Sequence, residues 1–310
     1  MTIDLALRRQ FFAEDIQATC NLSTSALVDA LASVPREAFL APGPWLVMGE
    51  GDIGSGPRRT PDADARHVYH NYSIAIHPAR QLFNGAPGVA SVMIDALGLR
   101  PGTRVLHVGA GWGYYSALLA HCVGPAGRVL AFEVDEGLAR QAATNLEPWP
   151  QVDVRHDDAS GPLGESFDAI LFSTGVTHPH DAWLDALAPA GRMVLPLTAS
   201  FGPVPAGLPV VNASPAAGTA KPPSAAMGNI GKGPVVAIAR SDEGQAWAAR
   251  VVTFIAIYSA IGIRDDGANA RLGEALKRNP FPRLKRLRRD RHEASPSCWL
   301  HGDKWCFALD

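Results

Sequence analysis

The sequence predicts an α/β fold: a doubly wound, mostly parallel sheet, preceded by N-terminal helices and followed by an added C-terminal α+β region. Two observations carry this prediction. Between residues 104 and 197, short apolar runs alternate with helical patterns over short connections, which is typical of a parallel sheet with helices on both faces. A glycine-rich turn after the first apolar run is typical of the ligand-binding edge of such a sheet.

Length and composition narrow the class of protein. The chain has 310 residues, 47% hydrophobic and 19% charged, with a formal net charge of −2. This length fits one large domain or two small ones, and no global positive charge is present to hold nucleic acid. No apolar run reaches the roughly 18–20 residues that span a bilayer. We therefore expect a cytoplasmic enzyme or binding protein with neither a nucleic-acid nor a membrane partner.

The four cysteines are spread over the chain, at Cys20, Cys122, Cys298 and Cys306. None forms a C-x-x-C pair, so the spacing gives neither a zinc pattern nor a disulfide framework. We therefore expect no metal.

Four regions are expected along the chain: an N-terminal helical and substrate-side region (1–85), a cofactor-binding core (86–198), a Pro/Gly-rich insertion or lid (199–234) and a C-terminal α+β region (235–310). In the first region, 5–40 has helical spacing of apolar residues, and 41–70 is rich in Gly and Pro, which predicts a loop or an edge hairpin. The core begins with a helix over 86–98.

The core then alternates between the two kinds of element. Strands are expected at 104–108, 127–134, 152–155, 168–172 and 192–197, with helices at 114–122, 136–146 and 181–187.

The C-terminal region is expected to hold further strands at 235–240, twice within 248–263, and at 305–309, with a helix over 268–278. Trp299 and Trp305 are expected to pack a small C-terminal sheet. The basic run at 283–291 lacks interleaved aromatic residues, so we interpret it as a solvated face.

The glycine-rich turn carries the clearest chemistry. Gly109, Gly111 and Gly113 let the backbone leave the strand sharply and approach a ligand, and the helix that follows presents free N–H groups. Glu133, at the end of the next strand, can accept hydrogen bonds from ribose hydroxyls. The third glycine comes one position earlier than in the dinucleotide pattern G-x-G-x-x-G, which favours S-adenosylmethionine over a nicotinamide or flavin cofactor. A purely structural tight turn is the remaining alternative.

The third core strand ends at His156-Asp157-Asp158. An acid at this place is expected to face the adenine amino group, and Asp158 is the first choice with Asp157 as the second. A solvated loop acid is the alternative.

Six segments lie in a fixed order within 34–198: V-P-R-E-A-F-L (34–40), P-G-T-R-V-L-H-V-G-A-G-W-G-Y-Y-S-A-L-L-A (101–120), G-R-V-L-A-F-E-V-D (127–135), R-H-D-D (155–158), F-D-A-I (167–170) and L-A-P-A-G-R-M-V-L-P-L-T (187–198). In this order they resemble the protein-L-isoaspartate O-methyltransferase family. The resemblance implies a Rossmann-like methyltransferase sheet with S-adenosyl-L-methionine as cofactor.

The resemblance also assigns residues. It implies that Gly109, Ala110, Gly111 and Gly113 line the cofactor, that Glu133 holds its ribose and that Asp158 holds its adenine end.

The chain departs from the family at two places. His107 stands where the family usually has Glu or Asp, near the methionine moiety, and it is counted among the cofactor-binding candidates. The family's T-I-S-x-P segment falls on Phe83 to Pro87, and the position of its active-site serine is Gly85.

Further polar residues could take part in chemistry at the carboxyl ends of the strands. Asn84 and His178 are the catalytic candidates, Thr177 and His77 are secondary, and Arg80 could pair with an acceptor carboxylate. The structural alternative for each is a loop or surface residue with local hydrogen bonds.

The resulting prediction is S-adenosylmethionine-dependent O-methylation of a carboxylate on a protein or peptide. The alternatives are a methyltransferase with a small-molecule acceptor and a non-catalytic binding protein that kept the fold.

Overall fold

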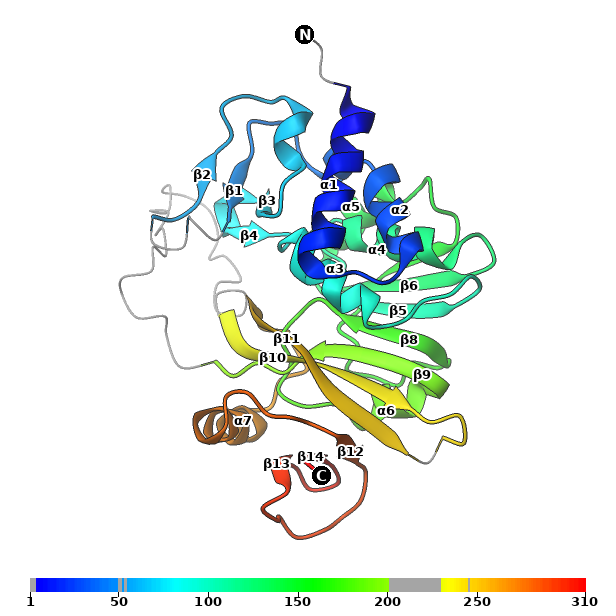
Figure 1. Ribbon diagram of the computed structural model, residues 1–310, viewed down its shortest axis with the longest axis vertical. Coiled ribbons are helices and arrows are strands. Elements are labelled where there is room, and N and C mark those ends of the chain that lie inside the picture. Colours follow the sequence, from blue (N-terminus) through cyan, green and yellow to red (C-terminus); the bar gives the residue numbers. More distant parts are fainter. Residues whose placement is uncertain (1–3, 50–51, 53–54, 201–229, 245) are drawn as a thin grey trace.

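The computed structural model describes residues 4–49, 52, 55–200, 230–244 and 246–310. Within them a ten-stranded sheet has the order β13-β14-β12-β11-β10-β9-β8-β5-β6-β7 (Figure 1). Its strands are β5 (Arg104–Val108), β6 (Arg128–Glu133), β7 (Val152–His156), β8 (Phe167–Phe172), β9 (Leu187–Pro196), β10 (Ile230–Arg240), β11 (Trp247–Tyr258), β12 (Arg286–Arg288), β13 (Cys298–His301) and β14 (Cys306–Ala308).

The sheet has a parallel half and an antiparallel half. Strands β5 to β9 pair in parallel, and the pairs from β9 through β10, β11, β12 and β14 to β13 are antiparallel. The parallel half coincides with the region in which the sequence alternates strands and helices. The α/β class, the parallel core and the added C-terminal α+β region are confirmed.

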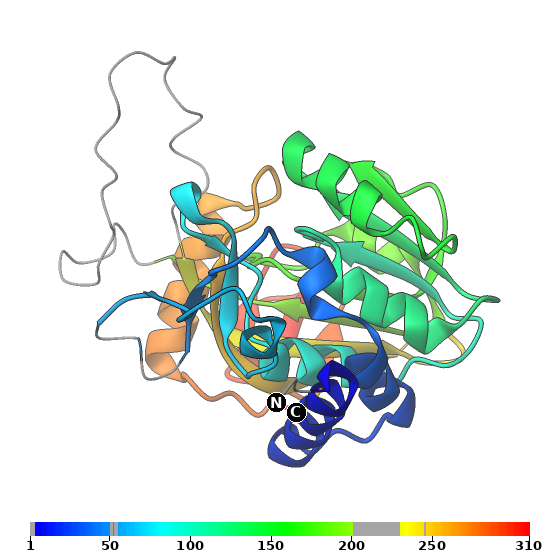
Figure 2. The ribbon, with the colours of Figure 1, turned by 90° about the horizontal axis from the view of Figure 1, so that it is seen from above.

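Helices cover both faces of the sheet. They are α1 (Leu5–Cys20), α2 (Ser25–Ser33), α3 (Pro87–Asp95), α4 (Tyr114–Val123), α5 (Glu136–Asn145), α6 (Asp181–Ala186) and α7 (Asp266–Arg278). Successive strand residues face opposite sides: Val105 packs in the core that includes α1 to α5, and Leu106 in the core that includes α6 and α7. Seen from above, α7 in orange lies on the opposite side of the molecule from α5 in green (Figure 2).

A second, four-stranded sheet lies beside the N-terminal helices. Its order is β2-β1-β3-β4, formed by β1 (Leu46–Met48), β2 (Arg58–Arg59), β3 (Ser73–His77) and β4 (Leu82–Phe83). The antiparallel pair of β1 and β2 agrees with the edge hairpin predicted within 41–70. Strands β3 and β4 were not predicted from the sequence.

A buried arginine anchors this N-terminal part. Arg36 is fully buried and donates hydrogen bonds to the backbone carbonyls of Val68, His70 and Tyr72 at 2.7, 3.0 and 2.9 Å. A buried charge is tolerated only with such partners. Arg36 of the V-P-R-E-A-F segment therefore has a folding role, whereas Phe39 at the end of the same segment lines the cavity described below.

Of three expectations for the C-terminal region, one is wrong, one is correct in part and one is confirmed. Only one strand, β11, occupies the part of 248–263 where two were expected, because 247–258 contains no turn-forming Gly, Pro, Asn or Asp. Trp299 and Trp305 pack against the C-terminal strands as expected, since both are buried on or beside β13 and β14, but these strands extend the main sheet rather than forming a small separate one. The solvated face expected for the basic run is confirmed, because none of its cations is buried and Arg283, Lys285, Arg286 and Arg291 are exposed, while Leu287 of β12 between them is buried.

The expected insertion at 199–234 falls for the most part outside the described residues. No helix in the described parts of the chain is both long and apolar enough to cross a membrane.

Candidate active site

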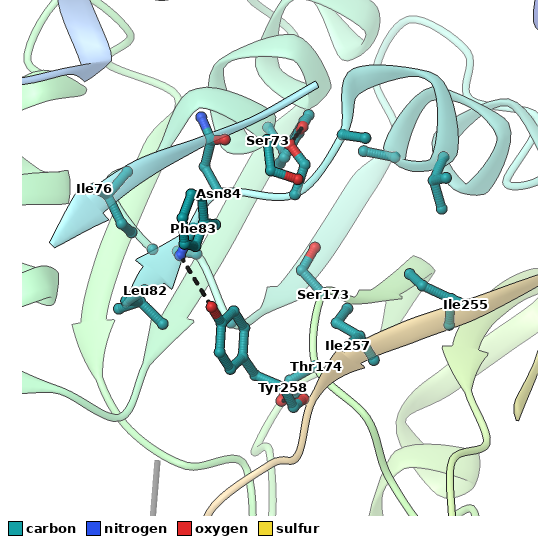
Figure 3. Close-up of a pocket in the computed structure, with 18 of the residues that line it drawn as sticks. Ser73, Ile76, Leu82, Phe83, Asn84, Ser173, Thr174, Ile255, Ile257 and Tyr258 are labelled. Atoms are coloured by element: carbon teal, nitrogen blue, oxygen red, sulfur yellow. Dashed lines mark hydrogen bonds between the residues drawn. The ribbon is translucent and has the colours of Figure 1, made fainter. Parts of the chain in front are cut away.

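A cavity of about 610 Å³ opens at the carboxyl ends of the parallel strands (Figure 3). This edge is where ligands bind in doubly wound sheets, and the volume falls in the usual range of small-molecule sites. The core strands supply one wall, the segment from β3 to α3 supplies a second, and β11 supplies a third. Residues from the N-terminal, core and C-terminal regions therefore all meet at one site.

The glycine-rich turn forms the floor of the cavity. Gly109 and Gly111 line it and have φ values of +87° and +58°, a region that favours glycine. The N–H groups of Gly109 and Ala110 donate to the Phe132 carbonyl at 2.9 and 3.1 Å, which ties the turn to the end of β6. The turn is thus fixed before any ligand arrives, and its backbone borders the cavity.

Gly113 has a different role from the other two glycines. It does not line the cavity, and a Cβ atom there would lie 2.7 Å from Leu146 Cδ1. Its φ is +93° and it precedes the first residue of α4. Gly113 therefore lets the start of α4 pack closely against Leu146, at the end of α5.

Glu133 is a buried carboxylate on the cavity lining. It is 7% exposed, and its Oε2 and Oε1 accept hydrogen bonds from the N–H groups of Gly111 at 2.8 Å and Asp135 at 3.0 Å. Burial raises the pKa of the carboxyl, and these two N–H groups oppose the rise. A carboxylate oxygen can accept more than one hydrogen bond, so Glu133 keeps acceptor capacity toward the cavity.

Asp157 and Asp158 both line the cavity beyond β7. Asp157 accepts from the Ala159 N–H at 2.7 Å, and Asp158 accepts from the Ser160 N–H at 2.9 Å. Asp158 is partly buried and Asp157 is exposed. A Cβ atom at Gly262 (φ +82°) would lie 2.3 Å from Asp158 Oδ2, so the glycine lets the chain after β11 approach this carboxylate.

His107 reaches the cavity only through a serine. Its ring is fully buried, with Nδ1 2.8 Å from Ser116 Oγ and Nε2 2.9 Å from Ser173 Oγ. Burial lowers the pKa of His107 to about 4, so the ring is neutral at neutral pH. Ser173 lines the cavity, and His107 holds its hydroxyl in place.

The segment after β4 borders the opposite side. Asn84 lines the cavity, and its Oδ1 accepts from the Ile74 N–H at 2.9 Å. Its buried Nδ2 has no hydrogen-bond partner among the described residues. Gly85 follows with φ +76°, and no atom of the described residues lies within 4 Å of an ideal Cβ position, so space is open among them where a side chain would project.

Tyr258 closes the cavity from β11. Its hydroxyl donates to the Gln81 carbonyl and accepts from the Phe83 N–H at 3.3 Å, the bond drawn in Figure 3. The C-terminal part is thereby fastened to the short strand β4. Figure 3 also shows Ile255 and Ile257 on the same strand, and both line the cavity.

Comparison with known proteins identifies the family. The family model for protein-L-isoaspartate(D-aspartate) O-methyltransferase matches residues 60–202. The protein-L-isoaspartate O-methyltransferase of Pyrobaculum arsenaticum is 30% identical over 196 residues, which cover 62% of this chain and 85% of that protein. The enzyme of the same name from Methylorubrum extorquens is 33% identical over 199 residues, covering 63% and 75%.

The chain belongs to this family. It is therefore an S-adenosylmethionine-dependent methyltransferase, as the glycine-rich turn and the resemblance predicted.

Solved structures support the fold. A structure named protein-L-isoaspartate O-methyltransferase superposes with a TM-score of 0.57 at 18% identity, covering 87% of this chain and 69% of the other. A putative member from Plasmodium falciparum, in complex with S-adenosyl-L-homocysteine, has a TM-score of 0.54 at 13% identity, covering 81% and 97%.

The fold gathers most of the residues that the methyltransferase resemblance assigned. Gly109, Ala110, Gly111, Glu133 and Asp158 all line the single cavity described above. Gly113 and His107 lie behind its wall. Each assigned residue therefore either lines the cavity or lies next to a residue that lines it.

Several candidates from the sequence lie elsewhere. His178 is not among the lining residues; its ring stacks on His180 and Trp305, with centroids 4.4 and 6.0 Å away. Thr177 Oγ1 lies 2.9 Å from His178 Nδ1. We give neither residue a role in the chemistry.

His77 and Arg80 also lie outside the lining of the cavity. Arg80 forms an ion pair with Asp135 at 2.8 Å. Asp135 also accepts from the Leu138 N–H, which caps α5. Arg80 therefore has an ionic partner at the start of α5, outside the cavity lining, rather than being reserved for an acceptor carboxylate.

Sequence reasoning missed Ser173, Tyr258 and Gly262. Ser173 directly follows β8, so its place at the carboxyl end of a parallel strand was a usable signal. Tyr258 and Gly262 carried no such signal, because only the antiparallel pairing of β11 brings them to the site.

Proposed function

We propose that this methyltransferase transfers a methyl group to a carboxylate of a protein or peptide. Two observations support the proposal: no Lys, Arg or His is among the described lining residues of the cavity, and its mouth has exposed apolar side chains. Ile230 and Phe254 line it and are 41% and 40% exposed, and Phe281, 71% exposed, packs on Phe254 with ring centroids 4.9 Å apart. Exposed apolar groups beside a cavity favour a macromolecular partner.

The cofactor end of the cavity is assigned from the acidic groups. S-adenosylmethionine, when bound, supplies a methyl group on a positively charged sulfonium. We propose that Glu133 accepts hydrogen bonds from the ribose hydroxyls, because its carboxylate is already oriented by two backbone N–H groups. Asp158 is proposed to hold the adenine end, with Asp157 as the second choice. The turn at Gly109, Ala110 and Gly111 would border the methionine end.

The acceptor end is mostly apolar, with Asn84 and Ser173 as polar groups on its lining, and such surroundings favour a reaction in which charge is lost. An ionised carboxylate needs no general base, and its negative charge disappears as the methyl group arrives. Loss of opposite charges is easier in surroundings of low polarity that exclude water. Ile255, Ile257 and Met93 provide such surroundings. Alignment and water exclusion, rather than proton transfer, would then supply the acceleration.

Asn84 and His107 are proposed as positioning residues. Asn84 ties the segment that bears Gly85 to β3 through Ile74. His107 fixes the hydroxyl of Ser173, which lines the cavity. Neither needs to change protonation state for this role.

We propose that 86–198 binds the cofactor, while 1–85 and 235–310 shape the acceptor side. The lining residues from β3, β4 and β11 support this division.

The family's serine position tests the acceptor assignment. Gly85→Ser places a hydroxyl in open space, at a cost of about 1–2 kcal/mol for the positive φ. We expect this variant to methylate an isoaspartyl peptide faster than the natural chain. Gly85→Ala is the matched control, because it has the same backbone strain and no hydroxyl. Equal rates for the Ser and Ala variants would show that the hydroxyl is not the missing element.

A panel of acceptors distinguishes the two classes of substrate. The proposal expects methylation of isoaspartyl or aspartyl peptides and little of free small carboxylates. Faster turnover of a small molecule than of any peptide would favour the small-molecule alternative.

A further inference from the structure

We propose that His292, Cys298 and Cys306 form a zinc site in the C-terminal region, which we call the Cys₂His cluster. One ligand atom from each side chain lies within 4.8 Å of the others. His292 Nε2 is 3.4 Å from Cys298 Sγ. Two ligand atoms on a tetrahedral zinc ion lie about 3.5–3.8 Å apart, given bonds of about 2.0 Å to nitrogen and 2.3 Å to sulfur. The cluster is therefore close to the geometry that the ion requires.

The strand pairing holds the two sulfur atoms on one face. Cys298 begins β13 and Cys306 begins β14, two antiparallel neighbours at the end of the main sheet. Cys298 is opposite Ala308 and His301 is opposite Cys306, so the cysteines are diagonal neighbours. Diagonal pairs have Cα atoms about 7–8 Å apart, beyond the roughly 4.4–6.8 Å of most disulfides. The pairing thus suits an ion between the sulfur atoms better than a bond.

The histidine is oriented as a ligand. Its Nδ1 lies 2.8 Å from Asp290 Oδ1, which leaves Nε2 directed at the sulfur of Cys298. Histidines that bind metals generally use their second nitrogen on a carboxylate or carbonyl in this way. The arrangement fixes the ring even before an ion binds.

The donor set selects the metal. Two thiolates and an imidazole favour zinc over magnesium or calcium, which prefer oxygen ligands. Cys306 is fully buried, Cys298 is 8% exposed and the His292 side chain is 12% exposed, so the site is nearly closed to solvent. A water molecule would take the fourth position. Binding would release the two thiol protons to solvent.

The position in the fold indicates a structural role. None of the three residues lines the cofactor cavity, which lies at the ends of other strands of the sheet. An ion here would join the segment before β13, which carries His292, to the β13–β14 pair. The C-terminal end of the sheet would then be fixed by metal as well as by strand pairing.

Metal content tests the proposal independently of methyl transfer. The full-length chain, produced without a polyhistidine tag and desalted, is expected to contain one zinc ion per chain by elemental analysis. Cys298→Ser and Cys306→Ser should lose it, while Cys20→Ser, the matched control on α1, should keep it. Cobalt(II) added to the metal-free chain should give a thiolate-to-metal charge-transfer band.

A substitution at Asp290 tests the zinc site without removing a ligand. Asp290 is half exposed, so Asp290→Asn should leave the fold intact. It is expected to weaken zinc binding by about 10–100-fold in competition with a chelator. The proposal is overturned if the natural chain binds neither zinc nor cobalt, or if mass spectrometry finds a Cys298–Cys306 disulfide. Equal zinc affinity in Asp290→Asn and the natural chain would also contradict the orientation assigned to His292.

Discussion

Replacing Glu133 by glutamine exchanges one carboxylate oxygen of the proposed cofactor site for an NH₂ group. In the structure both carboxylate oxygens accept a backbone N–H, from Gly111 at 2.8 Å and from Asp135 at 3.0 Å. A glutamine amide can accept at only one of these places, and its NH₂ group must face a donor at the other. The substitution therefore disturbs the turn as well as the contact proposed for the ribose.

The expected size of the effect follows from these contacts. A hydrogen bond to a charged group is worth about 1.5–3 kcal/mol. Loss of such a bond to the ribose corresponds to about 10–150-fold weaker binding of the cofactor. The buried N–H left without an acceptor adds about 1–3 kcal/mol of lost stability.

Titration calorimetry with S-adenosylhomocysteine measures the first quantity, and urea unfolding measures the second. Glu136→Gln is the matched control, because Glu136 is exposed on α5 and its ion pair among the described residues is a 3.9 Å contact with Arg140. It should change neither value. If Glu133→Gln binds the product as tightly as Glu136→Gln does, the ribose assignment is refuted.

Three further predictions concern the walls of the site. Gly262→Ala should weaken cofactor binding and cost about 1–2 kcal/mol, because its Cβ would meet Asp158 Oδ2 at a positive φ; calorimetry and unfolding check this, and an unchanged affinity would argue against Asp158 as a contact. Tyr258→Phe should raise the KM for a peptide acceptor more than the Kd for the cofactor, because the hydroxyl binds β11 to Gln81 and Phe83. Steady-state kinetics and calorimetry measure the two values, and an equal fold-change in KM and Kd would contradict this. His107, with its pKa lowered from 6.5 to about 4 by burial, stabilises the fold only while neutral, so about 3 kcal/mol should be lost as the pH falls from above 6.5 to below 4. His107→Gln should lack this share of the pH dependence of urea unfolding, and an identical pH profile would count against it.

The parallel half of the fold could be predicted because its signals are local. Strand β5, the glycine-rich turn and helix α4 follow one another without interruption, and their residue types determine the local backbone. Glu133 was predictable for the same reason, since it ends the strand that follows. The carboxyl ends of neighbouring parallel strands meet at one edge, so a linear pattern sufficed to place these residues together.

The remaining parts of the site depend on pairing between distant segments. Tyr258 contacts Gln81 across 177 positions of sequence, and no local pattern gives that register. The same holds for His292, Cys298 and Cys306, whose spacing gave no zinc pattern until β13 and β14 paired. His178 shows the converse. Its place after β8 suggested a catalytic role, but stacking against His180 directs the ring elsewhere.

The bond that holds the transferred methyl group distinguishes a carboxylate acceptor from every other acceptor. The purified chain is incubated with S-adenosylmethionine carrying a labelled methyl group and with an isoaspartyl peptide, and the peptide is then treated with mild base. A carboxyl ester releases labelled methanol, which is the result that the proposed acceptor predicts. A carboxylate acceptor is contradicted if the label stays on the peptide after base treatment. A peptide acceptor is contradicted if the chain binds S-adenosylhomocysteine but labels no peptide.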